Sequence, residues 1–166
     1  MRQPRLLIGP AGSACAEILG NVGFASWTHS AFGKDDAGRT DRDKLRDEFV
    51  NFCRDKPETM IVASADGKIL GWGAREDMDN IISDLWVAPS AQGQGVGAAL
   101  LEALEEAIAK QAFGFAELET YTGNAGAVRF YERHGYEPVW RGMKFSASLN
   151  YELDKVRFRK ALREAV

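Results

Sequence analysis

The sequence has little of what metal sites and disulfide scaffolds need. Of its 166 residues, two are cysteines and two are histidines. Cys15 and Cys53 lie far apart and match no metal-ligand spacing, so neither a zinc site nor a disulfide framework is expected. We therefore predict no metal site and a reduced, cytoplasmic protein.

Long apolar runs and an excess of positive charge are also lacking. No apolar stretch reaches the length of a membrane span, and the first residues do not form the apolar region of a signal peptide. The formal net charge is -3, whereas nucleic-acid binding usually calls for a basic face. The sequence thus predicts neither a membrane nor a nucleic-acid partner, and it is compatible with a homodimer.

The composition is that of an ordinary globular protein, with 45% hydrophobic and 27% charged residues. One domain over residues 1–166 is expected at this length. Periodicity and turn signals predict strands at residues 6–8, 60–64, 68–73, 80–87, 115–121, 136–141 and 148–156. They predict helices at 40–54, 97–111 and 124–134, a helical stretch at 13–30 that Gly20 and Gly23 interrupt, a loop at 32–39, and a charged tail at 157–166 that is compatible with a short helix.

Strands stand before and between the two late helices, with one hairpin signal early and one late. This order indicates an α/β or α+β domain with a mixed sheet, because an all-parallel sheet has no hairpins.

The most informative stretch is Ser90–Ala98, which lies between an apolar run and a helical run. Its order of strand, glycine-rich turn and helix places bare backbone N–H groups at a helix N-terminus, where they can hold an anion. No charged side chain occurs from Val87 to Leu101, so the positive end of the helix dipole has no acidic residue beside it. The stretch predicts a phosphate site, although its glycines could also serve only a tight turn.

The glycines admit a dinucleotide reading. Gly93, Gly95 and Ala98 satisfy the G-x-G-x-x-G/A fingerprint, and Glu117 and Glu119 lie about 20 residues further on, where that fold needs an acid. The chain that follows is too short to build both halves of a dinucleotide-binding sheet. Nicotinamide binding is therefore the less favoured reading.

A second parse of the loop is Gln92-x-x-Gly95-x-Gly97, directly after a strand and Pro89. A further motif occupies Asn124–Tyr136 and follows the pattern N-x-x-A-x-x-F-Y-x-x-x-G-F/Y. Together the two motifs resemble those of the GNAT superfamily of acyl-CoA-dependent N-acetyltransferases. The resemblance covers about residues 81–141, and the first 55 residues carry no such signature.

The resemblance implies a mixed, mostly antiparallel sheet that splays between two central parallel strands, with flanking helices. It also implies acetyl-CoA as the acyl donor, its pyrophosphate wrapped by main-chain amides of the loop. The implied loop residues are Gln92, Gly93, Gln94, Gly95, Val96, Gly97 and Ala98. Many relatives carry basic residues in this loop, whereas this chain has glutamines, so phosphate binding would rest more on backbone N–H groups.

The same resemblance assigns the rest of the donor site. The strand of Leu85, Trp86 and Val87 is expected to pair with the pantetheine amides and to donate an N–H to the thioester carbonyl. Asn124 would cap its helix, bond the pantetheine arm, or do both. Phe130 is expected to pack there rather than react.

Acetyl transfer needs an acid for the leaving thiolate and a base for the amine, which is mostly protonated at neutral pH. The resemblance implies Tyr131 as the general acid and Glu119 as the leading candidate for the base. Strand alternation puts Glu117, Glu119 and Tyr121 on one face. Asp84, on the neighbouring strand, is the alternative base, and the sequence does not decide between them.

The acceptor is expected to be a primary amine of a small molecule or peptide. Transfer would be direct, in a ternary complex, because neither motif contains a cysteine. Two charged segments conflict: the cations of Arg141–Ser146 favour an acidic acceptor, and the acidic loop Glu76–Asp79 a cationic one. Five side chains are candidates for an aromatic acceptor pocket: Trp27, His29, Trp72, Trp86 and Trp140. A non-catalytic acyl-CoA-binding module is the rival function.

Overall fold

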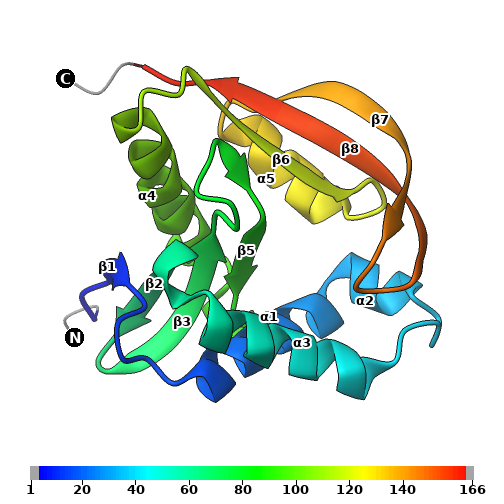
Figure 1. Ribbon diagram of the computed structural model, residues 1–166, viewed down its shortest axis with the longest axis horizontal. Helices are drawn as coiled ribbons and strands as arrows, with labels where there is room; N and C mark the ends of the chain where they lie inside the picture. The colour runs from blue at the N-terminus through cyan, green and yellow to red at the C-terminus, as the bar shows by residue number, and fades with distance from the viewer. Residues whose placement is uncertain (1–3, 164–166) are drawn as a thin grey trace.

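Two small sheets and several helices make up the fold (Figure 1). The computed structural model describes residues 4–163. The strands are β1 (Leu7–Pro10), β2 (Met60–Ala65), β3 (Lys68–Ala74), β4 (Ile81–Ile82), β5 (Asp84–Val87), β6 (Phe115–Tyr121), β7 (Glu137–Ser146) and β8 (Tyr151–Ala161). The helices are α1 (Ala16–His29), α2 (Ala31–Asp35), α3 (Arg42–Asp55), α4 (Val96–Lys110) and α5 (Ala125–Arg133), with 3₁₀ turns at Pro57–Thr59 and Pro89–Ala91. None of the described helices is long and apolar enough to cross a bilayer.

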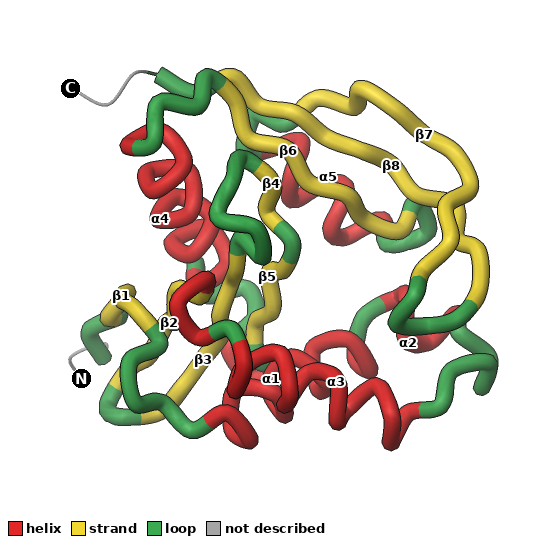
Figure 2. The backbone as a smooth tube through the Cα atoms, viewed as in Figure 1, coloured by secondary structure: helices red, strands yellow, loops and turns green. Residues whose placement is uncertain are grey.

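The strands form two four-stranded sheets that diverge from each other (Figure 2). The first has the order β1-β2-β3-β5 and is antiparallel throughout. The second has the order β4-β6-β8-β7, in which β4 and β6 are parallel and the other pairs antiparallel. The predicted architecture, a mostly antiparallel mixed sheet splayed at a parallel pair, is confirmed.

The splay arises at Ser83, which divides the single strand predicted over 80–87. Before it, β4 pairs with β6, with Ile81 opposite Glu117. After it, β5 pairs with β3 instead, with Trp86 opposite Trp72. The Ser83 N–H donates to the Ala74 carbonyl at 3.0 Å and so turns the chain toward β3. Within the described chain, the other edge of β5 has no strand paired to it, and the sheet is open there.

Helix α1 is continuous, so the predicted interruption is wrong. Gly20 and Gly23 are instead the points where α1 and α3 approach each other closely. A Cβ on Gly20 would lie 2.6 Å from Cα of Val50, and one on Gly23 would lie 2.7 Å from Cδ1 of Phe49. A glycine costs about 1 kcal/mol in a helix interior, but here this close packing requires it.

The core is divided between the two sheets. Trp72 on β3 is fully buried among α1 and α3 residues, and its Nε1 donates to the Leu19 carbonyl at 2.8 Å. On the other side, Leu104 and Ile108 of α4 pack with Phe158 of β8 in a second cluster. The helix predicted over 97–111 therefore buries an apolar face in this cluster. The two clusters lie on either side of the open edge of β5 and stabilise the elements that border it.

Two further expectations are corrected. The stretch expected as a loop over 32–39 contains most of α2, whose N-cap Ser30 accepts a bond from the Gly33 N–H at 3.2 Å. The expected tail begins inside β8, where Arg157–Ala161 pair with Phe115–Glu119 of β6. Residues 164–166 of that tail lie outside the described residues. Residues 157–161 are therefore strand rather than helix, because their backbone pairs with β6 and extends the second sheet.

Candidate active site

A first cavity of about 580 Å³ lies where β5, the glycine loop and α5 meet. The predicted residues on its wall are Leu85, Trp86, Val87, Gln92, Gly93, Gly95, Gly97, Ala98, Asn124, Phe130 and Tyr131. The predicted residues Gln94 and Val96 are not on the wall: Gln94 is exposed, and Val96 is buried in the core beneath the loop. The structure thus brings the two sequence motifs to one cavity.

The glycine loop aims the start of α4 at this cavity. Gly93 and Gly95 have φ angles of 74° and 82°, in the left-handed region that favours glycine. Gly95 is the N-cap, and among the described residues no side chain caps this helix. The first N–H groups of a helix have no intrahelical partner, so they remain free to bind an anion.

The two glutamines of the loop are used to hold its shape. Nε2 of Gln92 donates to the Val87 carbonyl at 3.2 Å, and Nε2 of Gln94 donates to the Ser90 carbonyl at 3.1 Å. Both side chains therefore bond to the loop's own backbone. The positive character of the loop comes from main-chain amides and the helix dipole rather than from a side-chain cation.

The start of α5 faces the loop from across the cavity. Oδ1 of Asn124 accepts from the Ala127 N–H at 3.5 Å and so caps the helix, as one of its two expected roles requires. A Cβ on Gly97 would lie 3.4 Å from Cζ of Phe130 and 3.6 Å from a methyl carbon of Val87. Phe130 thus fixes how closely α4 and α5 approach each other at the wall.

Tyr131 lies on the wall of the first cavity and packs against three aromatic rings. Its ring is 5.3 Å from Phe130, 5.9 Å from Tyr136 and 6.1 Å from Phe158, measured between ring centroids. Burial raises the pKa of the phenol above its ordinary value, and the charge of Asp84 raises it further. The hydroxyl therefore keeps its proton until a stronger base takes it.

Asp84 stands at the start of β5, where the strand leaves β6. Its carboxylate accepts from Nε1 of Trp86 at 3.0 Å and from the Ser83 hydroxyl at 2.9 Å. Burial raises the pKa of this carboxyl, even though both hydrogen bonds oppose the rise. A carboxylate whose pKa is raised in this way is a better proton acceptor than an exposed one.

A second cavity of about 590 Å³ lies on the other side of β5, between α1, α3 and the connection of β7 to β8. Trp86 is the one described residue that lines both cavities, so the two meet at β5. Asp84 lines the second cavity and Tyr131 the first. The aromatic residues of the second cavity are Trp27, Phe32, Phe49, Phe52, Trp86 and Phe145.

Only Trp27 and Trp86 of the five candidates for an aromatic pocket lie on this wall. Trp72 is buried in the core, and His29 is exposed outside both cavities. Trp140 lies on the second sheet, where the Arg157 guanidinium stands 5.4 Å from its ring centroid. The tryptophans therefore divide between core, cavity and sheet face, which residue type alone does not predict.

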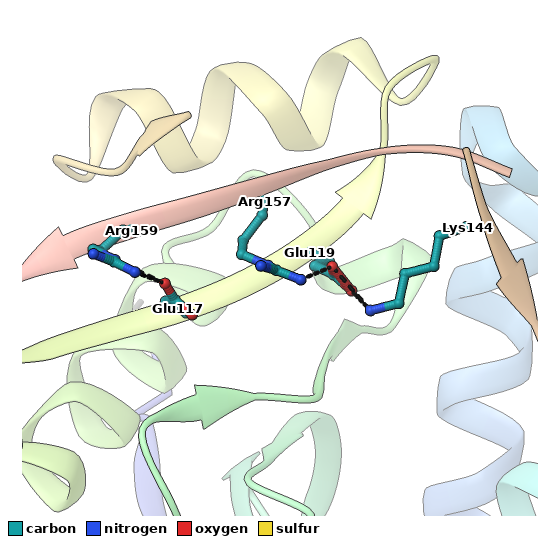
Figure 3. Close-up of polar contacts among 5 residues, drawn as sticks. All are labelled: Glu117, Glu119, Lys144, Arg157 and Arg159. Atoms are coloured by element: carbon teal, nitrogen blue, oxygen red, sulfur yellow. Dashed lines mark hydrogen bonds and ion pairs between the residues drawn. The ribbon is translucent and has the colours of Figure 1, made fainter. Parts of the chain in front are cut away.

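Glu119 lines neither cavity, and two cations hold its carboxylate (Figure 3). Nζ of Lys144 lies 2.7 Å from Oε1, and a guanidinium nitrogen of Arg157 lies 3.2 Å from Oε2. Burial alone would raise the pKa of Glu119, but the Lys144 hydrogen bond and the neighbouring positive charges hold it below its ordinary value. Glu117 is paired in the same way with Arg159, at 2.6 Å.

The comparisons with known proteins agree with this architecture. The model of the Acetyltransferase (GNAT) family matches residues 23–136, so the chain belongs to this family. Membership of this family indicates acyl transfer as the general activity.

Several solved structures share the fold at identities below 25%. A GCN5-related N-acetyltransferase from Rhodopseudomonas palustris matches with 19% identity and a TM-score of 0.71 over 98% of each chain. The ribosomal-protein-S18-alanine N-acetyltransferase from Escherichia coli matches with 17% identity and a TM-score of 0.67, over 98% of this chain and 97% of that one. An N-acetyltransferase from Thermoplasma acidophilum, solved in complex with coenzyme A, matches with 17% identity and a TM-score of 0.64, over 95% of this chain and 99% of that one.

Sequence reasoning missed part of both cavities. In the first, the wall also contains Ser26 of α1, Ser30 between α1 and α2, and Arg133 and His134 at the end of α5. In the second, Glu48 of α3 and Lys155 of β8 stand on the wall. The helical stripe that contains Phe49 predicted a core face for α3, which is correct, but nothing local shows that the same face borders a cavity.

Proposed function

We propose that the protein transfers an acetyl group from acetyl-CoA to a primary amine by direct attack in a ternary complex. The observation that carries the proposal is the meeting of the two cavities at Trp86, with Tyr131 on one side and Asp84 on the other. Donor and acceptor would enter from opposite sides of β5 and meet between an acid and a base. Membership of the family supports the acyl transfer itself.

The first cavity is the donor site in this proposal. The pyrophosphate would be bound by the N–H groups at the start of α4, which the φ angles of Gly93 and Gly95 turn toward the cavity. The pantetheine arm would pair with the free edge of β5, as an added strand does. The relative solved with coenzyme A supports an acyl-CoA of this kind.

Asp84 is the better candidate for the general base. It lines the acceptor cavity, and burial raises its pKa. Glu119 lies outside both cavities and is held by Lys144 and Arg157, so its proton affinity is low. A base must be near the proton that it removes and must be basic enough to take it, and Asp84 meets both conditions better.

The chemistry then proceeds with a balanced transfer of two protons. Asp84 removes a proton from the ammonium group of the acceptor, directly or through a water molecule. Asp84 then passes this proton to solvent. The free amine attacks the thioester carbonyl and a new C–N bond forms. The nitrogen loses its second proton to Asp84 or water, and the C–S bond breaks. A β5 backbone N–H stabilises the carbonyl oxygen as charge develops on it. The Tyr131 hydroxyl gives its proton to the leaving sulfur and regains one from Asp84 or solvent.

Both cysteines are free thiols, Cys53 buried and Cys15 exposed. Free thiols support the proposal that the enzyme works in the reducing cytoplasm. We propose small molecules or peptides as the acceptors there.

Two measurements test the proposal together. Acetyl-CoA should raise the melting temperature, and the reduced nicotinamide cofactor should not, because the loop opens on one cavity rather than on a dinucleotide-binding sheet. Thiol release from acetyl-CoA should then require an amine, in a screen of amines, amino acids, polyamines, aminoglycosides and peptides. If acetyl-CoA binds but no acceptor causes thiol release, the non-catalytic module is favoured. If only the nicotinamide cofactor stabilises the protein, acetyl-CoA is not the donor of this chain.

A further inference from the structure

The second cavity is acidic on the side formed by α3 and the β3–β5 region. Glu48, Glu76 and Asp84 all line it there. Glu76 is already paired, since Nζ of Lys56 lies 3.0 Å from it. Glu48 and Asp84 make no ion pair with any described residue, so they present negative charge to whatever fills the cavity.

The opposite wall, from the second sheet, is cationic. Lys155 of β8 lines the cavity there and makes no ion pair with a described residue. The two cations of the segment Arg141–Ser146, which the sequence offered for an acidic acceptor, are already in ion pairs. Arg141 lies 2.7 Å from Asp154, and Lys144 lies 2.7 Å from Glu119. Arg157 also binds Glu119. The single carboxylate of Glu119 thus faces the three cations Lys144, Lys155 and Arg157, and the cluster keeps an excess of positive charge.

No described carboxylate forms a close ion pair with the half-buried ammonium of Lys155, and Glu119 acts on it only as a nearby charge. Burial lowers the pKa of Lys155, Lys144 lowers it further, and Glu119 offsets only part of this effect. An unpaired buried charge is costly, and a ligand anion placed beside it recovers that cost. The aromatic rings of Trp27, Phe49 and Phe52 line the same cavity.

We infer, on the basis of the proposed acetyl transfer, that the acceptor is an amino acid with an apolar or aromatic body. Its ammonium group lies at Asp84, its carboxylate at Lys155, and its body against the aromatic wall. The two ends of this zwitterion are thus bound by Asp84 and Lys155. The two charged segments that conflict in the sequence do not bind it, because their residues Glu76, Arg141 and Lys144 are already paired. Lys155 is a specificity residue, and it takes no part in proton transfer.

The test compares matched pairs of acceptors that differ in the carboxylate. The pairs are L-phenylalanine with phenethylamine, L-leucine with 3-methylbutylamine, and 4-(aminomethyl)benzoate with benzylamine. Wild-type enzyme should prefer the carboxylate member of at least one pair by about tenfold or more in kcat/KM, as expected for a charge-assisted hydrogen bond. The third pair covers a wider separation of the two charged groups.

The variant Lys155→Met should bring this ratio close to one, whereas Lys155→Arg should keep most of it. Lys110→Met is the matched control, because Lys110 is exposed on the last turn of α4, away from both cavities, and the ratio should not change. A thermal shift with acetyl-CoA shows that each variant is folded and binds the donor.

The inference is overturned if wild-type enzyme acetylates the amines as well as or better than their carboxylate partners, or if Lys155→Met keeps the preference. It is also overturned if amines of the panel are acetylated but no amino acid is. Failure of the wild-type protein to bind acetyl-CoA, or binding without acetylation of any acceptor, would instead refute the proposed function, so the two failures are distinguishable.

Discussion

Replacing Asp84 by asparagine should slow catalysis and stabilise the fold at the same time. The asparagine oxygen can still accept from Nε1 of Trp86, now 3.0 Å from the carboxylate, so the strand geometry is kept. What is lost is the proton acceptor, and general-base catalysis contributes about 10²–10⁴-fold to a rate. Turnover should fall by that factor, with the affinity for acetyl-CoA little changed.

The gain in stability follows from the direction of the pKa shift. Burial raises the pKa of Asp84, so the folded protein holds this proton to higher pH than the unfolded chain does. Stability therefore decreases as pH rises through the folded-state pKa, since ionisation then disfavours the folded state. The melting temperature of Asp84→Asn should exceed that of the wild type, by an amount that grows as the pH rises through this range.

Glu119→Gln is the comparison that separates the two candidate bases. Burial alone would raise the pKa of Glu119, but Lys144 and the neighbouring cations lower it by more. The charge of Glu119 therefore stabilises the folded state at pH values above the pKa of the unfolded chain. This contribution is lost as pH falls through the folded-state pKa. The pairs with Lys144 and Arg157 are partly exposed and should contribute about 1 kcal/mol together, or roughly 2–4 °C in melting temperature. Turnover should change less than about tenfold, which is below the range for a lost base.

The assay is thiol release at saturating acetyl-CoA, with thermal unfolding of the same samples over a range of pH. A large loss of turnover in Glu119→Gln with near-normal turnover in Asp84→Asn would refute the assignment of the base. An Asp84→Asn protein less stable than the wild type at neutral pH would refute the electrostatic argument.

Three further substitutions test separate parts of the structure. Tyr131→Phe should lower turnover by about 10²-fold or more while acetyl-CoA affinity, measured by calorimetry, stays near that of the wild type, because the ring keeps its aromatic neighbours; unchanged turnover removes Tyr131 from the mechanism. Gly95→Val should weaken acetyl-CoA binding, because a β-branched residue disfavours a φ of 82° and the loop must move; unaltered affinity argues against the phosphate cradle. Gly20→Ala should destabilise the fold by about 1–3 kcal/mol in denaturant unfolding, because its Cβ would lie 2.6 Å from the Val50 backbone; wild-type stability contradicts the close packing of α1 on α3.

The elements that the sequence predicted well are those with local signals. Helix α4 has an apolar stripe, a glycine turn before it and no breaker inside, and α5 begins at a capping asparagine. The hairpin of β2 and β3 has an Asp-Gly turn between two strand-like runs. In each case the residues that determine the element lie within it or directly beside it, so composition and spacing suffice.

The features that the sequence did not predict depend on distant contacts. Gly20 reads as a break because nothing within α1 shows that Val50 packs against it. The strand over 80–87 reads as continuous because the switch at Ser83 depends on a bond to Ala74 of another strand. The residues next to Lys155 in the sequence do not indicate a role for it either, because the pairing of β8 with β6 places it on the cavity wall.

The roles of the acids show the same limit. Glu119 and Asp84 are both acids on strands that flank the opening, so residue type and position left them as alternatives. The environments that separate them are tertiary: the cations Lys144 and Arg157 come from β7 and β8, and the burial of Asp84 comes from the packing around β5.

The central claim is direct acetyl transfer from acetyl-CoA to an amine, and isotope tracing tests it most directly. Acetyl-CoA labelled with ¹³C in the acetyl group is incubated with the enzyme and the acceptor that gives the most thiol release. Mass spectrometry and NMR should then find the label in an N-acetyl amide, in equal amount to the coenzyme A released, and none on the protein. Label that stays on acetyl-CoA, appears only as free acetate, or accumulates on a protein side chain would contradict the account.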